Sequence, residues 1–305
     1  MKTKFSDFSK IKKKYLKFIK SQEVAGELFK DKLGQLNNYY IPISEMIYKN
    51  YSKNKRTSII GLSGGQGIGK STISNILKII LKEKFNLETV IFSIDDFYKT
   101  LRDRKKMSKT ISKLFLTRGA PGTHDTKMLF NCLIKLKKKS FSKIMIPKFD
   151  KSIDDRCKKN KWTKVLKKPD VVIFEGWCVG ARAQKNSSLI KSINPLERLE
   201  DKNLIWRKRI NYELKNKYKK IFNLIDILIF LKVPSFRYVY KWRLLQEKKL
   251  QKTSKGKKIM SNKQVKKFIM FYERITRHML KKSSFISNVL INIDTKHCLK
   301  SIKFN

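Results

Sequence analysis

Acidic residues, cysteines and long apolar runs are all scarce in this 305-residue chain. Only 24 residues are Asp or Glu, whereas 73 are Lys or Arg, so the formal net charge is +49. The four cysteines lack the paired spacing of a zinc or redox motif, and we interpret them as reduced thiols. No apolar run approaches the roughly 18 residues that span a bilayer, and the basic first residues lack the apolar core of a secretory signal. These absences argue against a zinc module, a membrane protein and an exported protein, and we expect a cytoplasmic location.

Lysine carries most of the positive charge. Sixty of the basic residues are Lys and thirteen are Arg, and the Lys residues are spread along the chain among many Asn, Ile and Ser residues. This distribution is typical of a codon bias, whereas recognition of phosphates or bases prefers the planar guanidinium of Arg. We therefore do not expect a nucleic-acid partner. The positive field would still speed the encounter with an anionic substrate.

Residues 64–71 read GGQGIGKS, which is a complete G-x-x-x-x-G-K-[ST] phosphate-binding loop. An apolar run at residues 58–62 leads into the loop, and residues 71–84 suit a helix. A strand, loop and helix in this order aim backbone N–H groups and a helix N-terminus at one point, where they can hold a polyphosphate. Lys70 can reach the β and γ phosphates, and the Ser71 hydroxyl can ligate Mg²⁺. The expected nucleotide-binding residues are Gly64, Gly65, Gln66, Gly67, Ile68, Gly69, Lys70, Ser71 and Thr72.

Short apolar runs alternate with helical segments along the rest of the chain. This alternation is typical of βαβ units on a parallel sheet that is buried on both faces. We therefore predict an α/β fold, in which residues 56–305 form a three-layer P-loop domain with a mainly parallel central sheet. Residues 1–55 are expected to form a helical N-terminal extension, interrupted near residues 37–42. The predicted strands are residues 58–62, 89–93, 171–174, 227–232 and 289–293, and further helices are expected at residues 125–138 and 203–222.

The motif SIDDFY, residues 93–98, follows the second predicted strand. Its two carboxylates would lie near the γ-phosphate, since both follow the phosphate loop by one βαβ unit. In a kinase that phosphorylates an alcohol, a carboxylate accepts the proton of the attacking hydroxyl, and Asp95 suits that role. Asp96 could assist Mg²⁺ or simply cap the following turn.

A further carboxylate ends the apolar strand that contains FEGW, residues 174–177. P-loop proteins usually carry a second acidic residue near the metal at this place, and Glu175 is our candidate. A buried strand end is a costly place for an unpaired carboxylate, so we expect a metal, water or a cation beside it. The alternative is a Glu that only accepts hydrogen bonds from the loop backbone.

The glycine-rich segment LTRGAPGTHD, residues 116–125, is constrained enough to hold groups at a site. Asp125 is expected to cap the following helix. His124 either contacts the substrate or is a structural histidine. After this segment, residues 147–152 and Arg156 supply Lys148, Asp150, Lys151 and a guanidinium that could clamp a carboxylate.

Together these segments resemble the D-glycerate 3-kinase family. The resemblance rests on GLSGGQGIGKST, SIDDFY, TRGAPGTHD, PKFDKS followed by DR, FEGWCVGAR, NPLERLED, WRLLQE followed by MS, and FYERITRH. It runs from about residue 57 to residue 294. The family belongs to a larger group of P-loop kinases that includes phosphoribulokinase, uridine kinase and pantothenate kinase. Two positions depart from the family pattern, because Asp154 stands where glycine is expected and Ala183 where proline is expected.

The resemblance implies phosphorylation of a small hydroxy acid by ATP with Mg²⁺, without a covalent intermediate. Asp95 matches the catalytic base, Lys70 the phosphate ligand, and Ser71 and Glu175 the metal site. The positions expected to bind the acceptor are Tyr98, Arg118, His124, Asp150 and Arg156.

Residues 234–262 resemble the lid of these kinases. Arg237 and Arg243 lie in this segment, and a lid Arg that closes on the transferring phosphoryl group would stabilise developing charge and exclude water. Alternatively, Arg243 and Glu247, four residues apart on a helix, only pair with each other.

We therefore predict a kinase that converts D-glycerate to 3-phosphoglycerate with Asp95 as general base and Lys70 and Arg243 as further catalytic residues. A P-loop kinase of another small alcohol, of the uridine, pantothenate or sugar-phosphate type, is the nearest alternative. A nucleotide-regulated RNA-binding protein is an alternative from another class, but SIDDFY and RGAPGTHD have no evident use in it. Sequence patterns do not determine the oligomeric state.

Overall fold

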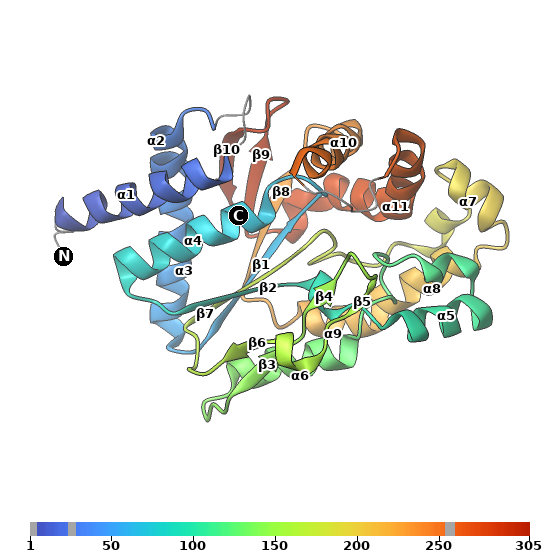
Figure 1. Ribbon diagram of the computed structural model, residues 1–305, viewed down its shortest axis with the longest axis horizontal. Helices are drawn as coiled ribbons and strands as arrows, with labels where there is room; N and C mark the ends of the chain where they lie inside the picture. The colour runs from blue at the N-terminus through green and yellow to red at the C-terminus, as the bar shows by residue number, and fades with distance from the viewer. Residues whose placement is uncertain (1–4, 24–28, 254–259) are drawn as a thin grey trace.

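A six-stranded sheet forms the centre of the molecule (Figure 1). The computed structural model describes residues 5–23, 29–253 and 260–305. The strand order is β10-β9-β8-β1-β7-β2, in which the last five strands are parallel and β10 pairs antiparallel with β9. This is the predicted mainly parallel α/β sheet. The strands are β1 (Ser58–Gly64), β2 (Thr89–Ser93), β7 (Val171–Gly176), β8 (Ile227–Lys232), β9 (Val289–Ile293) and β10 (Leu299–Phe304).

The sheet is buried on both faces, which explains why its parallel strands are continuous apolar runs rather than alternating ones. Successive side chains point to opposite faces, so each strand contributes to two separate hydrophobic clusters. Ile59 and Val172 lie in one cluster, whereas Ile60 and Ile173 lie in the other.

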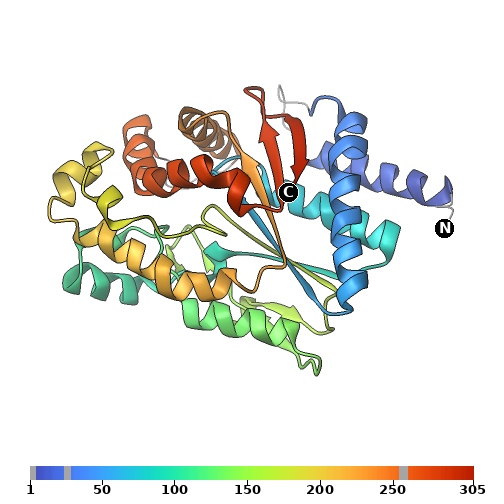
Figure 2. The ribbon, with the colours of Figure 1, turned by 180° about the vertical axis from the view of Figure 1, so that it is seen from behind.

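Helices cover both faces and give three layers (Figures 1 and 2). The helices on the face of Ile60 are α1 (Phe5–Gln22), α3 (Ile41–Asn54), α4 (Lys70–Phe85) and α10 (Phe236–Thr253). The helices on the face of Ile59 are α6 (Thr126–Lys137), α8 (Ile205–Glu213), the π-helix η6 (Leu214–Tyr218), α9 (Lys219–Phe222) and α11 (Asn262–Ile286).

The smaller elements connect the strands and the larger helices along the chain. They are α2 (Lys32–Gln35), the π-helix η1 (Leu36–Tyr40), the 3₁₀ turns η2 (Ile94–Phe97), η3 (Lys113–Leu116), η4 (Lys159–Lys161) and η5 (Asn186–Leu189), and the helices α5 (Leu101–Thr110) and α7 (Pro195–Glu200). Two short antiparallel pairs complete the fold: β3 (Ile144–Ile146) with β6 (Thr163–Val165), and β4 (Phe149–Asp150) with β5 (Asp155–Arg156).

The N-terminal helices share a core with the rest of the molecule. Ile11 and Ile19 of α1 and Ile47 of α3 are buried in the cluster that also contains Ile76 of α4. The expected interruption near residues 37–42 is wrong, because α2, η1 and α3 follow one another without a break. Pro42 lies in the first turn of α3, where a missing N–H is tolerated. The boundary at residue 55 stays a prediction.

The antiparallel strand β10 was not predicted. Its residues carry three polar side chains among six and lack the apolar run of the other strands. Its first residue is held from outside the sheet, because the side-chain amide of Gln35 donates to the carbonyl of Leu299 at 3.0 Å and accepts from its N–H at 3.1 Å.

Helix α10 occupies most of the predicted lid, residues 234–262, of which residues 254–259 lie outside the described part. The start of α10 lies against the phosphate-binding loop. A Cβ at Gly65 would approach a Val239 methyl to 2.9 Å, and one at Gly67 would approach the Trp242 carbonyl oxygen to 3.0 Å. Side chains are therefore excluded at both loop positions.

Two sequence expectations concern the whole chain. All four cysteines lie in the described part and are free thiols. In the residues that the structure describes, no helix has the length and apolar character that crossing a bilayer requires.

Candidate active site

The candidate site lies where three neighbouring strands end at the same edge of the sheet. Glu175 on β7 is in register with Leu62 on β1 and with Ser93 on β2. Because parallel strands end at one edge, this register places the phosphate-binding loop, Glu175 and the SIDDFY turn next to one another.

The phosphate-binding loop joins β1 directly to α4. Gly69 has φ 89° and precedes Lys70, the first residue of α4, and no atom lies within 4 Å of the position that a Cβ of Gly69 would take. The Lys70 ammonium donates to the carbonyls of Gly64 and Gly65, at 2.9 Å each. Burial lowers the pKa of Lys70, which Glu175 and Asp95 partly counteract. An anion at this loop would stabilise a buried cation that is now held by neutral carbonyls.

Glu175 lies against the first turns of α4. Its two oxygens accept hydrogen bonds from the Ser71 hydroxyl at 2.8 Å and the Ser74 hydroxyl at 3.2 Å. The side chain is buried. Glu175 is therefore bonded to two hydroxyls and not, as the alternative required, to loop backbone.

The two carboxylates of SIDDFY have different environments. Asp95 accepts from the Tyr98 hydroxyl at 2.8 Å and from the Lys151 ammonium at 2.7 Å. Burial alone would raise the pKa of Asp95. The charge and hydrogen bond of Lys151 and the hydrogen bond of Tyr98 have a larger, opposite effect, and the pKa falls to about 2. Asp96 accepts from the Ser93 N–H in a capping box, and burial, together with the charge of Asp95, raises its pKa to about 6. Asp96 thus caps the turn, and Asp95 is the carboxylate of the pair that stays ionised to the lower pH.

The glycine-rich segment carries a buried histidine that is held by a tyrosine hydroxyl. The Tyr218 hydroxyl accepts from the Gly122 N–H at 2.9 Å and lies 2.6 Å from Nδ1 of His124. The Tyr218 hydroxyl therefore connects the backbone of the glycine-rich segment to the imidazole ring. The ring also stacks on Tyr98, with centroids 4.6 Å apart. Burial lowers the pKa of His124 to about 4, so the imidazole is neutral at pH 7.

The predicted acceptor-binding cations are all paired with internal acids. Arg118 forms an ion pair with Asp154. Arg156 donates to the Tyr98 carbonyl at 2.9 Å and to the Asp125 carboxylate at 3.4 Å, while Asp125 caps α6 as expected.

The hydrogen bonds of the Asp150 carboxylate go to Ser152, which is not a predicted site residue. Its carboxylate accepts from the N–H and the hydroxyl of Ser152, and these bonds lower its pKa. The local turn thus accounts for its geometry, and its predicted contact with the acceptor stays a prediction.

Arg243 pairs with the residue four positions later on α10, as one of the two interpretations predicted. It forms an ion pair with Glu247, donates to Gln246 at 3.3 Å and lies over the Phe268 ring on α11, 5.5 Å from the centroid. Glu247 also accepts from the Met260 N–H at 3.0 Å. This carboxylate therefore connects the middle of the predicted lid, on α10, to its C-terminal end. Arg237 is exposed.

The loop and the Glu175 end of β7 fit a phosphate chain with a hard divalent cation. The Ser71 hydroxyl and the Glu175 carboxylate are the oxygen ligands that Mg²⁺ prefers, and Mg²⁺ commonly uses only one or two protein carboxylates beside substrate phosphates. In the described residues, no group of three or more His, Cys, Asp or Glu side chains gathers as a metal site. The buried side-chain amide of Gln66 lacks a partner among the described residues, and open space surrounds Gly69.

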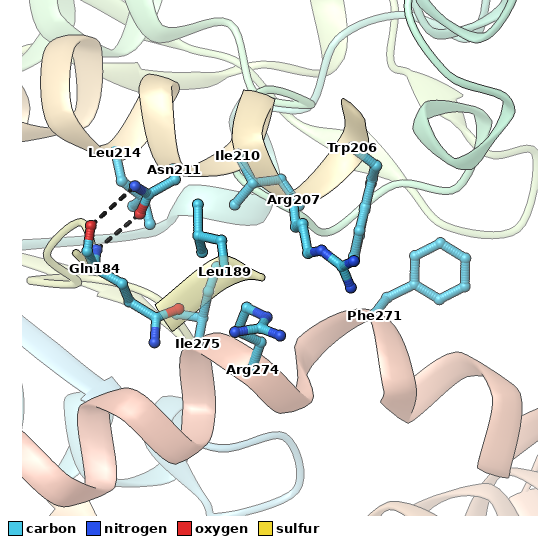
Figure 3. A pocket seen from close by; sticks show the side chains of 10 residues that line it. All are labelled: Gln184, Leu189, Trp206, Arg207, Ile210, Asn211, Leu214, Phe271, Arg274 and Ile275. Atoms are coloured by element: carbon cyan, nitrogen blue, oxygen red, sulfur yellow. Dashed lines mark hydrogen bonds between the residues drawn. The ribbon is translucent and has the colours of Figure 1, made fainter. Parts of the chain in front are cut away.

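A separate cavity lies between α8, α11 and the segment around Gln184 (Figure 3). It offers about 10 Å³ to the centre of a water molecule, enough for about one water. Arg207 and Arg274 line it, and both pair with buried Glu197. None of the predicted site residues lines this cavity, so we regard it as structural.

Residues 59–240 match the phosphoribulokinase/uridine kinase family. The chain belongs to this family. It is therefore a P-loop kinase. The resemblance to the group of kinases that includes phosphoribulokinase and uridine kinase is confirmed.

Comparisons with individual proteins agree with this assignment. The kinase is 34% identical over 256 residues to the uncharacterised kinase mug58 of Schizosaccharomyces pombe, covering 81% of this chain and 88% of that protein. It is 30% identical over 255 residues to the chloroplastic D-glycerate 3-kinase of Arabidopsis thaliana, covering 78% of this chain and 53% of the relative. The structure of D-glycerate 3-kinase from Cryptococcus neoformans has the same fold, with a TM-score of 0.74 at 24% identity over 87% of this chain and 99% of that one.

Two residues of the kinase site were not anticipated as site residues. Tyr218 comes from a π-helix inside a polar helical segment, and no local motif marks it. Tyr272 lies in FYERITRH, donates to the Arg118 carbonyl at 3.3 Å and packs edge-on against Trp177. A Cβ at Gly119 would approach the Tyr272 hydroxyl to 2.1 Å, which explains the glycine at that position.

The lowered pKa of His124 predicts a pH dependence of stability. Between pH 6.5 and pH 4 the unfolded chain binds a proton at this position and the folded chain does not, so stability falls as the pH falls through this window. We expect the wild type to lose about 2 to 3 kcal/mol more than His124→Asn between pH 7 and pH 4.5. Urea unfolding of both proteins at both pH values measures the difference. An equal loss in both would contradict the neutral buried imidazole.

Proposed function

We propose that this kinase transfers the γ-phosphoryl group of ATP to D-glycerate and forms 3-phosphoglycerate. The observation that carries the proposal is the environment of Asp95, an ionised carboxylate beside the phosphate-binding loop and beside the cations Lys151 and Lys70. Such a group can accept the hydroxyl proton of an alcohol that attacks a bound phosphate.

Asp95 would act on the acceptor hydroxyl as an oriented, permanently ionised acceptor. A pKa of about 2 makes it a weak base in the ground state. Phosphoryl transfer through a loose transition state demands the proton only late, so orientation matters more than basicity. Tyr98 fixes one carboxylate oxygen by its hydrogen bond. Lys151 is mostly exposed and can move from Asp95 toward a developing negative charge.

The nucleotide would be held by the phosphate-binding loop. Lys70 would exchange its bonds to the Gly64 and Gly65 carbonyls for phosphate oxygens, which are stronger partners for an ammonium group. Ser71 and Glu175 would hold Mg²⁺, which, when bound, supplies charge neutralisation on the phosphates. Ser74 keeps the second oxygen of Glu175 oriented.

A carboxylate-bearing acceptor is supported by the cations around Asp95. Arg118 pairs with Asp154 and Lys151 pairs with Asp95, and both pairs are partly exposed to solvent. The D-glycerate 3-kinase of Arabidopsis thaliana, similar over most of this chain, points to the same acceptor class.

A substrate panel tests the proposed reaction. Release of ADP with Mg·ATP should be selective for D-glycerate over L-glycerate, glycolate, pantothenate, uridine and ribulose 5-phosphate, and the product should be 3-phosphoglycerate and not the 2-phosphate. Selective turnover of another alcohol would replace D-glycerate and leave the kinase assignment in place. ATP binding without turnover of any acceptor, together with salt-sensitive RNA binding, would favour the regulated RNA-binding protein.

The role of Asp95 predicts the behaviour of Asp95→Asn. The amide keeps the shape of the side chain but cannot accept the proton, so kcat should fall by at least about a hundredfold, the scale of a lost general base. Binding of ATP, measured by calorimetry, should change little, because Asp95 does not belong to the phosphate loop. Turnover close to the wild-type value would remove Asp95 from the mechanism.

Two substitutions on α10 separate the two interpretations of Arg243. If its guanidinium acts on the transferring phosphoryl group, Arg243→Ala should lower kcat by about a hundredfold or more. Glu247→Gln should leave kcat within about threefold, because the glutamine oxygen can still accept from Met260 and the guanidinium is freed. Equal, small effects of both substitutions on kcat would show that the pair is only structural.

A further inference from the structure

The turn between β4 and β5 carries a residue in an uncommon backbone conformation. Asp154 has φ 55°, in the left-handed region that glycine adopts freely and that other residues enter at some cost. Asp is one of the few side chains tolerated there. A strained position of this kind persists when the side chain is fixed by its contacts.

The Asp154 carboxylate bridges two arginines. One oxygen pairs with Arg118, and the other lies 3.0 Å from Nη2 of Arg104. The two guanidinium groups also lie over the same Phe149 ring, 5.6 and 6.0 Å from its centroid.

The two arginines differ in their freedom. Arg104 is fully buried and donates to the carbonyls of Leu116 and Asp154 at 2.6 Å each, so the protein holds it in place. The Arg118 side chain is 26% exposed and the Asp154 side chain 37% exposed. Only the pair between Arg118 and Asp154 can therefore exchange partners without leaving a buried charge unpaired.

The same turn also reaches the catalytic carboxylate. Lys151, three residues before Asp154, pairs with Asp95. The same turn thus supplies Asp154, the anion that pairs with Arg118, and Lys151, the cation that pairs with Asp95. A small alcohol with a carboxylate presents matching groups to the same two residues, its hydroxyl to Asp95 and its carboxylate to Arg118.

We propose that Asp154 competes with the acceptor carboxylate for Arg118 and thereby sets the affinity and charge selectivity for the acceptor. This inference rests on the proposed function, because it assumes an acceptor that carries a carboxylate. Exchange of one carboxylate for another keeps Arg118 neutralised throughout. The displaced Asp154 keeps Arg104 as its partner and gains water on its exposed side.

The test uses the full chain with Asp154→Asn, which removes the charge and keeps a residue suited to φ 55°. KM for D-glycerate should fall by about three- to tenfold at nearly unchanged kcat, the scale of a partly exposed ion pair. KM for glycerol, which has no carboxylate, should not change. Asp103→Asn is the matched control, because it removes the same charge from an exposed residue on neighbouring α5, where the Asp103 carboxylate accepts from the Thr100 hydroxyl.

Asp154→Gly protects the test against a folding defect of the Asn variant. Glycine adopts φ 55° without strain, and the bond from Arg104 to the carbonyl of residue 154 remains possible. KM does not depend on the fraction of the enzyme that is folded. The ratio of KM for D-glycerate to KM for glycerol is therefore measurable even in a variant of lower stability. Three results would overturn the proposal. They are a KM ratio equal to that of the wild type in both variants, an equal fall of KM for D-glycerate and for glycerol, and a higher KM for D-glycerate.

Failure of the proposed function would be recognised separately. If the wild type phosphorylates no carboxylate acceptor, binding of glycolate and of ethylene glycol to wild type, Asp154→Asn and Asp103→Asn is measured by calorimetry. Tighter glycolate binding only in Asp154→Asn, with ethylene glycol binding unchanged, would still support competition for Arg118. Equal glycolate binding in all three proteins would reject it.

Discussion

The parallel, in-register pairing of β7 between β1 and β2 is the constraint on which the rest of the site depends. It places Glu175 level with the last residue of β2 and two residues before the end of β1, so that the Ser71 hydroxyl reaches its carboxylate and the turn with Asp95 begins at the same level. A shift of one residue would turn Glu175 toward the opposite face of the sheet. The apolar side chains packed in both hydrophobic clusters oppose such a shift, and the core thereby fixes the catalytic geometry.

Scarce acidic residues are concentrated around this geometry. The chain has only 24 of them, yet Asp95, Asp125, Asp154 and Glu247 each neutralise a cation at or near the site. In a chain of net charge +49, unpaired arginines beside a phosphate loop would attract any anion. Under the proposed competition, internal carboxylates would restrict binding to anions that can displace them, and a general attraction for anions would become selectivity.

Sequence patterns predicted the parts of the fold that depend on local chemistry. The five parallel strands are apolar runs, and the phosphate loop has a fixed spacing, so both were recognised with nearly correct bounds. Strand β10 was missed because an exposed edge strand needs no apolar run. Tyr218 was missed because it reaches His124 only through packing of distant segments. The bridge from Asp154 to two arginines likewise arises from tertiary contacts, although the departure from glycine at this position was visible.

The close contact between α10 and the phosphate-binding loop determines where α10 can bend. Val239 and Trp242 leave no room for side chains at Gly65 and Gly67, so the first turns of α10 pack directly against the loop. If α10 closes as the proposed lid, the closing motion would pivot beyond Trp242, toward the part that Glu247 ties to Met260. The proposed hinge would therefore rest on the same glycines that would hold the phosphates, and a larger residue at either position would disturb both.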